Sequence, residues 1–115
     1  MNLESKIYEL SFELSEVIDK NDLQKLLGVL SNDGVYAMWV YAKDKLKEEA
    51  KKTKITDLII KLDYFIKVKK ESDNNKIHSQ YFQNLAQDLN KLLFMKELLE
   101  KVFIYALYHA KAKGD

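Results

Sequence analysis

Two histidines are the only imidazole groups in the sequence, and neither has a partner for catalysis nearby. His78 lies beside a polar stretch and His109 lies near the carboxyl end. Neither has an acidic residue or a second histidine at the spacing of a metal site such as H-E-x-x-H. The absence of cysteine excludes thiolate chemistry, and three glycines are too few for a phosphate-cradling loop. We therefore expect no enzymatic activity, no metal and no other cofactor, although a site assembled in space from distant residues stays open.

Lysine provides the most concentrated charge in the chain. All 19 basic residues are lysine, so bidentate recognition of phosphate by arginine is excluded. On a continuous helix, the i, i+4 spacing of Lys43, Lys47 and Lys51 would form one row, which suits contact with a phosphate backbone. An ordinary solvated helix with internal pairs such as Glu48–Lys52 is the alternative interpretation. The full cluster falls within residues 43–54 and consists of Lys43, Lys45, Lys47, Lys51, Lys52 and Lys54.

Charge is distributed unevenly along the chain. Residues 1–42 hold three lysines and seven acids, which gives −4, whereas residues 43–70 hold ten lysines and five acids, which gives +5. The remainder is balanced, with six of each. An acidic start followed by a basic middle favours a polyanionic partner or head-to-tail stacking of copies, although chance blocks on solvated faces would look the same.

Helices must position these residues, because apolar side chains recur at helical spacing throughout the chain. A chain of 115 residues without proline is typical of a single all-α domain, here residues 1–115, built as a bundle of about five helices. Trp39 falls on an apolar stripe and is expected to be buried, whereas Tyr36 and Tyr41 lie off it. We expect helices over residues 3–20, from Asp22 to about Leu30, from Val35 through the charged stretch to Lys54, from Thr53 or Thr56 to the polar stretch at 71–75, and over residues 79–112.

The last expected helix is too long for a compact domain of this size. Its 34 residues would span about 50 Å, whereas a domain of about 100 residues has a radius of gyration of about 13 Å. Either this helix breaks or one end projects. Its later part is apolar nearly all round, which indicates either an interface with another chain or cover from neighbouring helices. The candidate interface residues are Phe94, Leu98, Tyr105 and Tyr108.

The amino terminus lacks the order of basic, apolar and small residues that marks a signal peptide. No apolar run approaches the roughly 20 residues that cross a bilayer. A cytoplasmic location is the simplest expectation.

Two stretches carry a family resemblance. Residues 30–46 read LSNDGVYAMWVYAKDKL, a polar Asn-Gly turn that opens a helix with apolar, aromatic and then lysine positions. Residues 81–102 read YFQNLAQDLNKLLFMKELLEKV, a small residue and a polar pair before a leucine-rich helix. In order and character these stretches resemble the small helical subunit of type III CRISPR effector complexes, particularly the Cmr branch. The Csm branch and the small subunit of type I complexes are also similar.

The resemblance implies a noncatalytic role. Such subunits stack into a filament along the crRNA–target duplex, so the implied partners are other effector subunits, crRNA and target RNA, and further copies of the chain. Carried over to this sequence, the implied RNA contacts are Asn32 and Gly34 of the turn together with Lys43, Lys47 and Lys51, to which the cluster adds Lys52 and Lys54.

Two other functions stay open from the residues alone. One is a self-associating helical interaction module, viral or regulatory, that uses the apolar end of the last helix. The other is a helix-turn-helix DNA-binding regulator, because residues 23–42 supply two helices around a glycine-containing turn.

Overall fold

The structure is a computed structural model in which residues 2–68 and 77–114 are described. All regular structure in these ranges is helical, which confirms the expected all-α fold with a long last helix. Six helices are present within them, one more than expected. They are α1 (Leu3–Val17), α2 (Lys20–Asp33), α3 (Val35–Lys45), α4 (Glu49–Ile66), α5 (Ser79–Ala86) and α6 (Leu89–Ala112).

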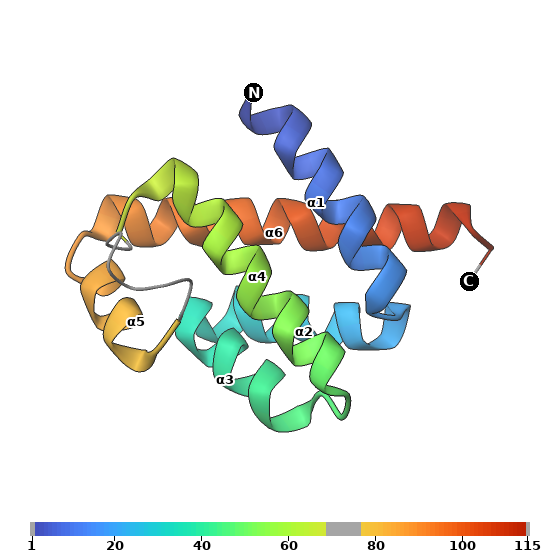
Figure 1. The fold of residues 1–115 in the computed structure, drawn as a ribbon, viewed down its shortest axis with the longest axis horizontal. Coiled ribbons are helices and arrows are strands. Elements are labelled where there is room, and N and C mark those ends of the chain that lie inside the picture. Colours follow the sequence, from blue (N-terminus) through green and yellow to red (C-terminus); the bar gives the residue numbers. More distant parts are fainter. Residues whose placement is uncertain (1, 69–76, 115) are drawn as a thin grey trace.

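Helix α6 forms the spine of the fold, because it contacts every other helix. It runs along the long axis of the molecule, and α1 and α4 cross it obliquely (Figure 1). Helix α2 packs beside it and contacts α3, and α5 packs near the start of α6. One apolar core joins all six helices, and Phe103 of α6 is the largest of its fully buried side chains. None of the helices in the described ranges has both the length and the apolarity that a membrane crossing requires.

The boundary between α1 and α2 differs from the expected one. Helix α1 ends at Val17 rather than Lys20, because Ile18 takes an extended backbone and places its side chain in the core. Asp19 then caps α2, and its carboxylate accepts a hydrogen bond from the backbone N–H of Asp22 at 2.9 Å. Asp22, where the second helix was expected to begin, lies inside the first turn of α2 instead.

The turn between α2 and α3 is tighter than the sequence indicated. Helix α2 continues through Asn32 to Asp33, and the chain reverses at Gly34 alone. Gly34 has φ 100° and ψ −177°, a backbone conformation that is essentially restricted to glycine. A single glycine therefore sets the angle between α2 and α3.

We expect Gly34→Ala to lower the free energy of unfolding by about 1–3 kcal/mol through backbone strain. A Cβ at this position would meet no atom within 4 Å, so a steric clash would not contribute. Gly28→Ala, inside α2 and equally unobstructed, is the matched control and should stabilise by roughly 0.5–1 kcal/mol. Urea denaturation of both variants measures the difference, and equal midpoints would contradict the assignment of strain to Gly34.

The charged stretch from Lys43 to Lys54 is not one helix, contrary to the expectation. Helix α3 ends at Lys45 and α4 begins at Glu49, earlier than the expected Thr53 or Thr56. Leu46 between them adopts an extended backbone, and its side chain is only 3% exposed. Because the Leu46 side chain is buried in the core, its backbone leaves the helical conformation and α3 ends there.

The single helix expected over residues 79–112 is divided into two helices, α5 and α6, so neither is too long for the domain. Helix α5 ends at Ala86, and Asp88 caps α6 by accepting a hydrogen bond from the N–H of Lys91 at 3.2 Å. Phe82 and Leu85 of α5 are thereby buried in the core. The 24 residues of α6 span about 36 Å, within a molecule whose longest extent is 40 Å and whose radius of gyration is 13.3 Å. The polar stretch at 71–75, which the sequence marked as a flexible loop, lies outside the described residues.

A buried acid ties α5 to the end of α4. The Asp63 carboxylate accepts a hydrogen bond from the Tyr81 hydroxyl at 2.7 Å and another from the N–H of Val68 at 3.0 Å. Burial of Tyr81, reinforced by this hydrogen bond and by the negative charge of Asp63, raises the pKa of the Tyr81 hydroxyl far above its ordinary value. Tyr81 therefore stays a neutral donor, and Asp63 fixes the position of α5 against α4.

Candidate nucleic-acid interface

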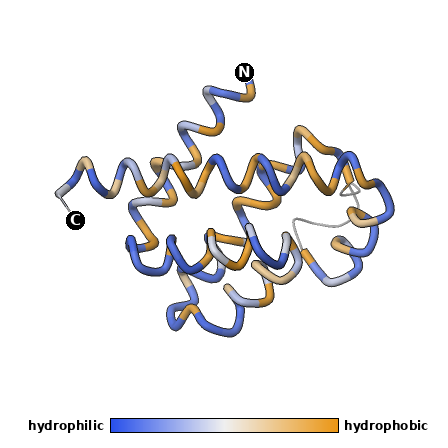
Figure 2. Tube along the Cα trace, turned by 180° about the vertical axis from the view of Figure 1, so that it is seen from behind, coloured by the Kyte–Doolittle hydropathy of each residue, from blue (hydrophilic) through white to orange (hydrophobic). Residues whose placement is uncertain are grey.

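The lysine cluster lies where α3 turns into α4, a segment of residues 43–54 that we term the α3–α4 corner. This corner is hydrophilic almost without interruption (Figure 2). The expected row of Lys43, Lys47 and Lys51 does not form along a helix, because Lys43 belongs to α3, Lys47 to the connection and Lys51 to α4. The corner nevertheless brings these residues to one end of two adjacent helices.

Three lysines of the corner make no ion pair in the described ranges. Lys47 is exposed and Lys52 is half-buried. The exposed Lys43 places its Nζ 4.5 Å from the ring centroid of Trp39, whose burial confirms the sequence expectation. A fourth lysine, Lys45, pairs only with its neighbour Asp44 at 3.5 Å on the open surface, where such a pair contributes little. These four ammonium groups are available to an anionic partner.

Lys51 has a structural role instead. Its side chain is only 16% exposed, and its Nζ lies 3.3 Å from Asp22, 3.8 Å from Asp19 and 3.8 Å from Glu48. Burial alone would lower the pKa of Lys51, but the hydrogen bond to Asp22 and the three negative charges outweigh it, so its pKa is raised. Lys51 therefore joins the start of α4 to the start of α2 and neutralises acids there.

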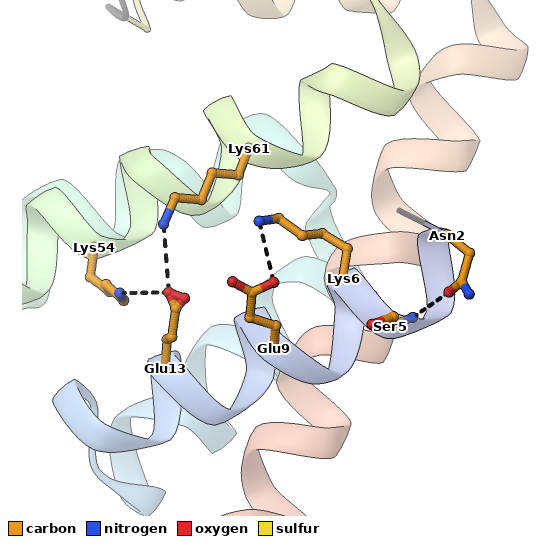
Figure 3. Close-up of polar contacts among 7 residues, drawn as sticks. All are labelled: Asn2, Ser5, Lys6, Glu9, Glu13, Lys54 and Lys61. Carbon is orange, nitrogen blue, oxygen red and sulfur yellow. Dashed lines mark hydrogen bonds and ion pairs between the residues drawn. The ribbon is translucent and has the colours of Figure 1, made fainter.

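Lys54 also pairs within the fold. Its Nζ lies 3.9 Å from the Glu13 carboxylate of α1, which Lys61 of α4 approaches to 3.6 Å (Figure 3). In the structure, Lys61 faces α1 rather than α3, a placement that periodicity along one helix could not reveal.

The turn residues Asn32 and Gly34 lie away from the corner. Gly34 precedes the first residue of α3 and Lys43 lies in its last turn, so they are about 14 Å apart along the helix axis. Asn32 is exposed at the end of α2. A contact surface that includes both the turn and the lysines must therefore extend along the whole of α3, where Tyr36 is also exposed and Tyr41 is half-buried.

A cleft of about 470 Å³ opens beside the corner, between the start of α2 and the end of α3. Lys45 and Lys47 line it together with Lys25 and Tyr41, and the acids on its wall are those that Lys51 approaches. Lys51 thus partly neutralises these acids, while the other lysines that line the cleft remain at its edge. This arrangement suits a sequence-independent contact with phosphates.

Exposed rings gather where α1 crosses the carboxyl-terminal half of α6, a feature that we term the aromatic surface. Tyr8 and Tyr105 pack edge to face with centroids 5.1 Å apart, and Phe12 packs on His109 at 5.5 Å. A hydrogen bond to Glu4 at 2.8 Å, with that acid's charge, raises the pKa of Tyr8 to about 12. The surface comprises Tyr8, Phe12, Tyr105, Tyr108 and His109.

The expected interface residues on α6 have different surroundings. Tyr108 is 59% exposed and Tyr105 is half-buried, so both are accessible on the aromatic surface. Leu98 is 2% exposed and packs in the chain's own core, where another chain cannot reach it. Phe94 is half-buried against that core. Tyr8 and Phe12 were not predicted from the sequence as interface residues, because their place in this surface depends on how α1 crosses α6.

The two histidines are not brought together. His78 precedes α5, His109 lies near the end of α6, and these segments occupy opposite ends of the long axis (Figure 1). No group of three or more acidic or histidine side chains in the described ranges has the arrangement of a metal site.

At the start of α3, Val35, Met38 and Trp39 are buried, which leaves few side chains there for reading base edges as a recognition helix does.

Comparisons with known protein families, curated proteins and solved structures gave no match.

Proposed function

We propose that this chain is a noncatalytic small subunit of a crRNA-guided CRISPR ribonucleoprotein complex, acting in the cytoplasm. It contacts the backbone of the crRNA–target RNA through the α3–α4 corner. The observation that carries this proposal is the division among the lysines. Lys51 and Lys54 pair with acids of other helices, whereas within the described ranges Lys43, Lys45, Lys47 and Lys52 make no ion pair beyond an adjacent residue.

The corner supports backbone contact rather than base readout. Lysine ammonium groups attract phosphates as point charges, and the chain has no arginine to clamp a base edge. Lys43 and Lys45 also lie in the last turn of α3, where positive charge is favoured by the helix dipole. Their positive charge is therefore favoured without an acidic partner, and in the part of the chain that the structure describes neither lysine makes a cross-helix ion pair that RNA would have to replace.

The direct test is binding of the purified chain to a blunt RNA duplex, followed by fluorescence anisotropy. Contact through phosphates predicts similar affinity for unrelated sequences and a steep loss of affinity as salt rises. Strong preference for one duplex sequence would indicate base readout, as in the helix-turn-helix alternative, rather than contact through phosphates. Absence of duplex binding at low salt would contradict the proposal.

The aromatic surface supports a second candidate, a self-associating helical module. Four exposed or half-buried aromatic side chains on two helices form the kind of apolar patch that marks protein contacts. Sedimentation at increasing concentration separates the two candidates. A concentration-dependent oligomer without RNA affinity favours the module, whereas RNA binding by a monomer favours the subunit.

A further inference from the structure

A groove of about 640 Å³ lies between α1 and α4, apart from the corner and the aromatic surface. The two helices cross α6 with their upper ends apart in Figure 1, and the groove lies between their side chains. Its volume is within the range of about 300–1,000 Å³ typical of sites for small organic ligands. The lining residues are Lys6, Lys61, Tyr64, Phe65 and Lys67.

Positive charge exceeds negative charge around this groove. Lys6 of α1 and Lys61 of α4 extend into the space between the helices from opposite sides (Figure 3). Glu9 lies 3.4 Å from Lys6, and Glu13 is shared by Lys61 and Lys54. Lys67 makes no ion pair in the described ranges. The three lysines that line the groove therefore face two glutamates, which leaves one positive charge in excess to attract an anion, while the two ion pairs of Glu13 hold α1 on α4.

An exposed aromatic ring adjoins these ammonium groups. Tyr64 of α4 is 69% exposed, and its ring centroid is 5.2 Å from that of Phe65. Phe65 is half-buried and supports Tyr64 from one side. An aromatic ring that is held in place beside lysines can stack a nucleobase whose phosphate the lysines bind.

We propose that the α1–α4 groove binds a single-stranded RNA nucleotide, with its base stacked on Tyr64 and its phosphate on Lys67, which makes no ion pair in the described ranges, beside the paired ammonium groups of Lys6 and Lys61. The choice of RNA rests on the function proposed above, whereas the stacking site is an additional claim. A base inside a duplex is already stacked and paired, so it cannot reach Tyr64. The groove therefore selects unpaired nucleotides, while the corner accepts duplex RNA.

The test compares a blunt RNA duplex with a single-stranded oligonucleotide that carries the fluorescent base 2-aminopurine. For Tyr64→Ala we expect about a fivefold loss of affinity for the single strand and unchanged affinity for the duplex. Tyr64→Phe keeps the ring and should retain both affinities. Stacking on wild-type protein should also change the 2-aminopurine emission, and Tyr64→Ala should abolish that change.

Each outcome separates this inference from the proposed function. If duplex RNA binds and Tyr64→Ala leaves single-strand affinity and 2-aminopurine emission unchanged, the stacking site is wrong and the subunit function stands. If single-stranded RNA binds through Tyr64 but duplex RNA does not bind, the groove stands and the corner assignment fails. Failure of single-stranded RNA to bind at all overturns the groove proposal.

Discussion

The double reversal Lys43→Glu with Lys47→Glu is expected to lower the affinity for duplex RNA roughly 10- to 100-fold at low salt. Both lysines are exposed, and neither forms an ion pair in the described ranges, so the loss reports on the ligand rather than on a broken internal pair. Removing two phosphate contacts should also make the logarithm of affinity depend less steeply on the logarithm of salt, by about two in slope. Anisotropy titrations at several salt concentrations measure both quantities.

A matched control is Lys101→Glu with Lys111→Glu on α6. These lysines are exposed, lack an ion pair in the described ranges and change the net charge by the same amount. If nonspecific attraction alone drives binding, both double variants will weaken it equally, and the corner loses its special role. Circular dichroism should show the same helix content in all three proteins. If the control variant folds but Lys43→Glu with Lys47→Glu does not, the loss of RNA affinity would be explained by the lost Lys43–Trp39 contact rather than by lost phosphate contacts.

The second large effect concerns stability. Asp63→Ala is expected to lower the free energy of unfolding by about 3 kcal/mol, because the buried Tyr81 hydroxyl and the Val68 N–H lose their acceptor. Tyr81→Phe removes only the hydroxyl and should cost about 1–2 kcal/mol. Urea denaturation, with the slope checked for constancy, measures both changes.

Asp63→Asn is the conservative control for this prediction. The amide keeps a side-chain oxygen that can accept from Tyr81, so its loss should be smaller than that of Asp63→Ala. If Asp63→Ala were as stable as wild type, the carboxylate would not be what fixes α5 against α4. If Asp63→Ala and Asp63→Asn lower the free energy of unfolding equally, the stabilisation comes from the negative charge of Asp63 rather than from its oxygen as a hydrogen-bond acceptor.

The apolar stripes were sufficient to predict the helical class and the position of most helices, because each helix must turn its apolar side to one core. They predicted the burial of Trp39 for the same reason. The boundaries were less accurate where two residues could cap the same helix. Asp19 and Asp22 are both good caps, and the choice depends on Ile18, whose side chain enters the core only if α1 ends before it.

The candidate site was harder to predict, because its geometry depends on contacts between helices. The lysine row assumed one helix through residue 46, whereas burial of Leu46 turns the chain there. Lys51 and Lys54 looked like Lys43 in the sequence, yet acids of α1 and α2 pair with them. The groove needs Lys6 beside Tyr64, and no pattern within either helix indicates that the two helices meet there.

The most direct test of the proposed function is recovery of the tagged chain from its native host, with the bound RNA sequenced and the bound proteins identified by mass spectrometry. The proposal predicts a particle of several subunits that contains short guide RNAs. It also predicts that target RNA, once paired with the guide RNA in this particle, crosslinks to the α3–α4 corner. Recovery of the chain alone, or only with further copies of itself, would contradict the subunit function and favour the self-associating module.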